Sequence, residues 1–103
     1  MFTETALAEL RKTLLKQVSY AQYVIDDEVQ QAEIESASIL EDGRIVFNLS
    51  INAAANDRKT ITQVQLFSAD GTLLAYKDEN ILCDVNLGNI YYCFYFSIVE
   101  AAE

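Results

Sequence analysis

The sequence predicts a mainly β fold, an antiparallel β-sandwich-like domain of about six strands preceded by one N-terminal amphipathic helix. Three observations support this prediction. Apolar residues recur at helical spacing in residues 3–17, and from residue 18 onward they alternate with a period of two. Asp42-Gly43 and Asp70-Gly71 are typical of tight hairpin turns. The short strands between such turns favour a sandwich over a βαβ fold, and the alternative is an open sheet with the helix across one face.

Residues 3–17 form the predicted helix. Leu7, Leu10 and Leu14 lie on one face at helical spacing, and Thr3 precedes them as a typical N-cap residue. Because a helix of this length is marginal alone in water, its apolar stripe must pack against another surface.

The strands that follow are predicted at residues 18–25, 29–40, 44–52, 60–68, 72–80 and 89–99. A two-residue turn at Asp42-Gly43 needs positive φ at both positions, and it pairs Leu40 with Ile45 and Ser38 with Phe47. Small residues of one strand then face large residues of the other, which specifies the register.

The second hairpin is predicted around the three-residue loop Ala69-Asp70-Gly71, with Gly71 in the left-handed region. This loop pairs Leu66 with Leu74 and Val64 with Tyr76. Apolar residues then stay together on one face of the sheet.

The last predicted strand carries no charge between residues 90 and 99. One face holds Ile90, Tyr92, Phe94, Phe96 and Ile98, and the other holds Tyr91, Cys93, Tyr95, Ser97 and Val99. A half-solvated strand would alternate with charges, so we expect both faces to be covered. The N-terminal helix and a second copy of the protein are the two alternatives for the second cover.

The 103 residues correspond to one domain, predicted over 1–103. A net charge of −9 matches a nucleic-acid backbone poorly, and no apolar run approaches the length that spans a bilayer. We therefore expect neither nucleic acid nor membrane as a partner. Residues 2–4 lack the pattern of a signal peptide, which predicts a protein that is cytoplasmic as synthesised.

The composition offers little catalytic chemistry. The chain has no histidine and only three glycines, so a histidine-based catalytic arrangement and a glycine-rich phosphate loop are both excluded. Cys83 and Cys93 can pair geometrically, although thiols in a chain without a signal are more often reduced. Two cysteines without histidine fall short of a zinc site. We expect no enzyme activity, no catalytic residue, no cofactor and no metal.

Five segments are considered together: Ser19–Ile25, Ala32–Ile34, Asp42–Ile45, Ile61–Phe67 and Asp70-Gly71. In these segments the chain resembles small uncharacterised proteins of bacterial phages and prophages that are encoded near tail genes. The resemblance covers residues 19–99 and implies a virion-associated or tail-region role, with assembly into a phage particle. It brings no catalytic residues.

The function that we expect is a non-catalytic structural or interaction module, and the alternative is a small-molecule or carbohydrate-binding β module. Tyrosines combine a large contact area with a polar tip, which suits an interface. The sequence predicts a homo-oligomer, or binding to another structural protein. The candidate interface residues are Leu7, Leu10, Leu14, Tyr91 and Tyr95.

Overall fold

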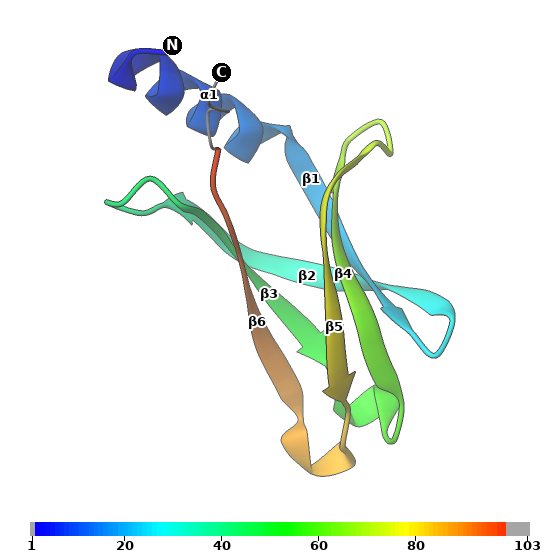
Figure 1. Ribbon diagram of the computed structural model, residues 1–103. Helices are drawn as coiled ribbons and strands as arrows, with labels where there is room; N and C mark the ends of the chain where they lie inside the picture. The colour runs from blue at the N-terminus through cyan, green and yellow to red at the C-terminus, as the bar shows by residue number, and fades with distance from the viewer. Residues whose placement is uncertain (1, 99–103) are drawn as a thin grey trace.

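The computed structural model describes residues 2–98, whose strands form one curled sheet (Figure 1). The strand order is β5-β4-β1-β2-β3-β6, and all neighbours pair antiparallel. One helix, α1, precedes the strands. The predicted mainly β class with antiparallel strands and an N-terminal helix is confirmed. The predicted sandwich is not confirmed, because the described strands belong to a single sheet.

The strands are β1 (Val18–Ile25), β2 (Glu28–Ile39), β3 (Ile45–Asn52), β4 (Thr60–Ser68), β5 (Leu73–Leu82) and β6 (Asn89–Phe96). The bounds of β1 and β4 match the prediction, and β5 continues to Leu82. The predicted end of the last strand at Val99 lies outside the described residues, and β6 itself ends at Phe96. Two short 3-10 helices, η1 (Ala54–Asn56) and η2 (Val85–Leu87), occupy the connections on either side of β4 and β5.

Helix α1 (Glu4–Gln17) begins at the expected cap, where Thr3 Oγ1 accepts a hydrogen bond from the Ala6 N–H at 3.1 Å. It leads directly into β1 and stands at one end of the sheet (Figure 1). None of its residues is fully buried, and Leu14 and Leu15 join the edge of the core. The radius of gyration of 15.2 Å exceeds the roughly 13 Å typical of a chain this long. The molecule is therefore elongated; the single sheet agrees with the first part of the alternative, an open sheet, and α1 contacts β1 and β2.

Strand β2 is shared by the two halves of the sheet. Its first part pairs with β1 as far as Ala32, and from Glu33 onward it pairs with β3. Each flanking strand therefore covers only part of β2. This change of partner lets the sheet curl, so that the inner faces of distant strands turn toward one another (Figure 1).

The β2–β3 hairpin exists as predicted, but its register is wrong by one residue. Ile39 pairs with Ile45 and Ala37 with Phe47, because the loop has three residues instead of two. Of Asp42 and Gly43 only the glycine has positive φ, at 90°, so the two-residue turn cannot form. The Leu40 N–H bonds to the Arg44 carbonyl at 2.8 Å and closes the longer loop.

A bulge between Ile34 and Ser36 then shifts the hairpin by a further residue. Ile34 pairs with Leu49 instead of Ile51, and both side chains point toward the core. The bulge therefore restores an apolar pair on the inner face after the longer loop has displaced the register.

The β4–β5 hairpin has the predicted three-residue loop, with Gly71 at φ 87° and the Ser68 N–H bonded to the Thr72 carbonyl at 2.9 Å. The predicted pairs are wrong beyond it. A bulge between Leu66 and Phe67 pairs Val64 with Lys77 instead of Tyr76.

That bulge turns Tyr76 outward, where it is 57% exposed, and brings Lys77 inward. The Lys77 ammonium lies 5.2 Å from the centroid of the Phe94 ring, so a cation–π contact holds the inward side chain. The pairing that keeps only apolar residues together is therefore not the one that the sheet adopts.

The core lies within the curl. Its largest fully buried side chains include Tyr23, Phe47, Phe94, Ile25 and Leu66. They come from β1, β3, β4 and β6, whose inward residues alternate with outward ones. Through Phe94, the core includes the inner face of β6.

Candidate interaction surface

Strand β6 is an edge strand, because β3 is its only neighbour in the sheet. Its residues, Asn89–Phe96, carry no charge. The chain has no charged residue at all between Asp84 and Glu100. An edge strand presents a row of backbone N–H and C=O groups to its surroundings, so β6 exposes an uncharged template for pairing.

Alternation along β3 identifies which backbone groups of β6 lie at this edge. The carbonyl of Arg44 accepts from the N–H of Leu40, the residue that follows β2, so the backbone groups of Arg44 point to the β2 side. Successive residues of a strand point their backbone groups to opposite sides, so Ile45 points toward β6 and its partner Phe96. The same alternation along β6 directs the backbone groups of Tyr91, Cys93 and Tyr95 to the free edge.

The side chains of these three residues form a row on the outer face. Tyr91 is 73% exposed, Tyr95 is 37% exposed, and Cys93 is an exposed free thiol. The Cys93 thiol donates to Asn48 Oδ1 at 3.2 Å, and the Arg44 guanidinium carbon lies 5.1 Å from the centroid of the Tyr95 ring. Within the described residues α1 does not cover this outer row, so that alternative for the second cover is wrong, and cover by a second copy stays a prediction.

Two side chains on the inner face of β6 contact the opposite edge strand, β5. The Tyr92 hydroxyl donates a hydrogen bond to the Glu79 carboxylate of β5, and Phe94 lies in the core beside Lys77. Burial, followed by the hydrogen bond to Glu79 and its negative charge, raises the pKa of Tyr92 well above the ordinary value. The phenol therefore stays neutral at neutral pH, and its hydrogen bond to Glu79 links β6 to β5.

The predicted interface residues fall into two groups. Tyr91 and Tyr95 belong to the outer row of β6, whereas Leu7, Leu10 and Leu14 belong to α1, which packs against β1 and β2. Leu10 is 40% exposed, and Leu7 and Leu14 are half-buried. The helix thus leaves Tyr91 open.

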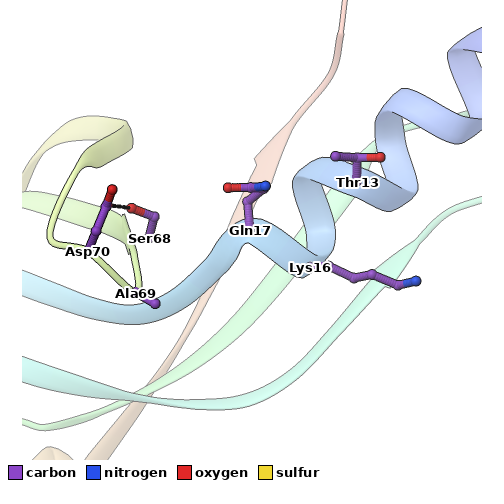
Figure 2. Close-up of a pocket in the computed structure, with 6 residues that line it drawn as sticks. All are labelled: Thr13, Lys16, Gln17, Ser68, Ala69 and Asp70. Atoms are coloured by element: carbon purple, nitrogen blue, oxygen red, sulfur yellow. Dashed lines mark hydrogen bonds between the residues drawn. The ribbon is translucent and has the colours of Figure 1, made fainter.

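A hollow of about 490 Å³ lies between the last turns of α1 and the β4–β5 loop (Figure 2). Asp70 already accepts from the Ser68 hydroxyl and the Thr72 N–H, and these bonds hold the pKa of its carboxyl below 3.8. Figure 2 shows the Lys16 side chain extending away from Asp70. The charged groups here do not converge on a common point.

A second hollow, of about 390 Å³, lies where β2 changes partner, beside three polar side chains in mutual contact. The Tyr23 hydroxyl donates to Gln30 at 2.8 Å, Gln30 donates to Asn56 at 2.8 Å, and Asn56 donates to the Tyr23 hydroxyl at 3.1 Å. Each of the three side chains both donates a hydrogen bond to and accepts one from another member of the cluster. We therefore interpret the cluster as a contribution to the stability of the fold.

Asn56, a buried member of this polar cluster, is not among the residues that the sequence singles out. It is 2% exposed, although it lies in a segment that reads as a polar loop. The sequence feature that could indicate its burial is the run of three alanines, Ala53–Ala55, directly before it, because small apolar residues in a loop indicate partial burial.

Within residues 2–98, no three His, Cys, Asp or Glu side chains are grouped to hold a metal ion. The same part of the chain holds no helix that is both long enough and apolar enough to cross a bilayer. Comparison with known proteins gives no match. No family model, no curated protein and no solved structure matches the chain.

Proposed function

We propose that the protein is a non-catalytic interaction module that accepts a strand from another polypeptide at the free edge of β6. One observation supports the proposal: the edge that presents the backbone groups of Tyr91, Cys93 and Tyr95 has no strand paired to it among the described residues, and β6 itself carries no charged residue. Strand addition to such an edge gives affinity through main-chain hydrogen bonds and specificity through alternate side chains.

The contrast between the two edge strands supports the proposal. Strand β5 places Lys77 and Glu79 on the inner face and Asp78 on the outer face, and inward-pointing charges are a common protection against edge pairing. Strand β6 has no such protection. The β5 edge thus carries charged residues that oppose strand pairing, whereas the β6 edge carries none.

In this proposal the curled sheet works as a sandwich-like scaffold that holds β6 rigid against β5. A structural role in a phage or prophage particle, after synthesis in the cytoplasm, is part of the proposal and rests on the resemblance of residues 19–99. The alternative of a small-molecule or carbohydrate-binding module has less support. The polar groups beside Tyr23 already bond to one another, and the exposed tyrosines of β6 lie along an open strand.

The test is a titration with a short uncharged peptide of alternating threonine and tyrosine, at protein concentrations that keep the chain monomeric. We expect the peptide to protect the edge amides of Tyr91, Cys93 and Tyr95 from hydrogen exchange and to leave the β5 amides unchanged. A peptide N-methylated at every residue should not bind, because it has no N–H group left to donate to the β6 edge.

Two matched variants complete the titration. Tyr91→Lys places a charge on the open edge and should weaken peptide binding, whereas Tyr76→Lys changes an exposed tyrosine of β5 and should bind as the parent does. Equal protection of both edges, or none at β6, would overturn the proposed function.

A further inference from the structure

The sequence of β6 and the residue after it has nearly the same chemistry when it is read in either direction from Cys93. Pairs at equal distance from Cys93 are Tyr92 and Phe94, Tyr91 and Tyr95, Ile90 and Phe96, and Asn89 and Ser97. Antiparallel pairing of two copies brings each residue opposite its counterpart across the two-fold axis. A strand with this pattern therefore matches its own copy.

We infer that two copies of the chain pair antiparallel through their β6 edges, with the two-fold axis at Cys93. This inference rests on the proposed function and names the partner. Cys93 then lies opposite Cys93 of the second copy, and each Tyr91 lies opposite a Tyr95. The two curled sheets join into one continuous sheet.

The directions of the backbone groups agree with this register. The residues whose N–H and C=O groups point to the free edge are Tyr91, Cys93 and Tyr95, and a register centred on Cys93 pairs these residues only with each other. Centring the pairing on the neighbouring Tyr92 or Phe94 shortens the overlap of the strands and places a tyrosine opposite the small Cys93.

Charge also favours a second copy at this edge. Each chain carries a net charge of −9, so most of its surface repels another copy. The stretch between Asp84 and Glu100 holds no acidic residue, so the β6 edges approach without placing two carboxylates face to face. Aromatic pairs across neighbouring strands are favourable contacts, and this register forms two Tyr91–Tyr95 pairs.

The first test is sedimentation of the full chain from micromolar to near-millimolar concentration. We expect a reversible dimer with twice the monomer mass of 11.6 kDa. Cys93→Asp places two carboxylates opposite each other on the axis and should weaken dimerisation about tenfold or more. Cys93→Ser should dimerise like the parent, and Tyr76→Asp, which adds the same charge on β5, should do so too.

The second test traps the register with the oxidant diamide, which takes the two thiol hydrogens as the disulfide forms. In this register Cys93 and Cys93 of the second copy form a hydrogen-bonded pair, whose Cα atoms lie about 5.5 Å apart, within reach of a disulfide. Cys83 is buried, so only Cys93 is accessible, and Cys93→Ser should give no covalent dimer.

The outcomes separate the inference from the proposed function. A chain that stays monomeric while its β6 edge still binds the threonine–tyrosine peptide overturns the inference and leaves the proposed function standing. A dimer that survives Cys93→Asp, or that forms no Cys93 disulfide, overturns the register. A monomer whose β6 edge also rejects the peptide overturns both.

Discussion

The Tyr92 hydroxyl on β6 donates a hydrogen bond to the Glu79 carboxylate on β5, which joins the first and last strands of the sheet order through their side chains. The two strands are not paired by backbone hydrogen bonds. Beside this contact, the Lys77 ammonium lies over the ring of Phe94. The curl of the sheet is therefore closed by two polar contacts at the inner edge of the core.

Tyr92→Phe should lower the free energy of unfolding by about 1 kcal/mol at neutral pH, because the Glu79 carboxylate loses its donor. Urea unfolding followed by circular dichroism measures this change. Tyr91→Phe is the matched control, since that hydroxyl belongs to a strongly exposed side chain, and it should leave stability within about 0.5 kcal/mol of the parent. Equal stability of the two variants would contradict a closing role for Tyr92.

Stability at alkaline pH should depend on the same tyrosine. Because the pKa of Tyr92 is raised in the folded state, its stabilising contribution is complete below the ordinary value of 10 and is lost as the pH rises above it. The parent should therefore lose stability more steeply than Tyr92→Phe between about pH 9 and about pH 12. Urea midpoints across this range measure both slopes, and parallel slopes would contradict the raised pKa. Tyr23, whose pKa burial also raises, is present in both proteins.

Asn56→Ala should cost about 2–3 kcal/mol of unfolding free energy, since it leaves buried polar groups without partners. The Asn56 amide donates to the Tyr23 hydroxyl and, at 2.8 Å, to the Asn52 carbonyl, and its oxygen accepts from Gln30. Asn80→Ala removes an exposed asparagine of β5 and should change stability by less than about 0.5 kcal/mol. Equal urea midpoints for the two variants would show that the cluster adds no stability.

Gly43→Ala and Gly71→Ala should both destabilise the protein, by about 1 kcal/mol or more, because both glycines have φ near 90°. A methyl group at Gly43 would lie 3.0 Å from the Arg11 guanidinium, whereas at Gly71 its nearest neighbour is the Tyr20 hydroxyl at 3.7 Å. The Gly43 variant should therefore cost more.

A double-mutant cycle isolates the cause of that difference. In an Arg11→Ala background the two glycine variants should cost the same, because the side chain that the new methyl group meets is gone. A persistent excess cost at Gly43 would show that Arg11 does not restrict this position.

Arg44→Met should raise the pKa of Asp42 part of the way toward 3.8. The backbone N–H of Arg44 is the largest cause of the lowered pKa, and its guanidinium, 2.7 Å from Asp42 Oδ2, adds to it. Carboxyl carbon shifts followed by NMR during an acid titration measure the change. Asp70 serves as an internal control, since Ser68 and Thr72 lower its pKa. An unchanged Asp42 titration would contradict the contribution of the guanidinium.

Local patterns in the sequence were sufficient to predict the elements. The Thr3 cap and the bounds of Val18–Ile25 and Thr60–Ser68 depend on capping and on alternation within a few residues, and these predictions are confirmed. The pairings were not predictable from the same information. The bulges before Ser36 and Phe67 depend on contacts between strands that are distant in sequence, such as the position of Lys77 over Phe94.

The sequence predicts part of the exposed surface of β6, namely its lack of charge and the shared face of its tyrosines, but not whether the helix covers that face. The absence of charge marked this strand as unusual, and the sequence placed Tyr91 and Tyr95 on one face. Whether the helix covers them depends on where α1 docks, which is decided by half-buried contacts of Leu14 and Leu15 with the core. Apolar spacing fixes the face of a helix that packs, but it does not specify the surface that receives it.

The strand order also has a consequence for the time course of folding. The second neighbour of β3 is β6, which lies much later in the sequence, as Ile45 pairs with Phe96. Pairings between residues so distant in sequence close large loops, and domains rich in them fold in milliseconds to seconds. During synthesis from the N-terminus, β3 is made before β6, so the edge of β3 that later pairs with β6 is exposed without a partner. We expect the nascent chain to be most prone to mispairing or aggregation in the interval before β6 is synthesised.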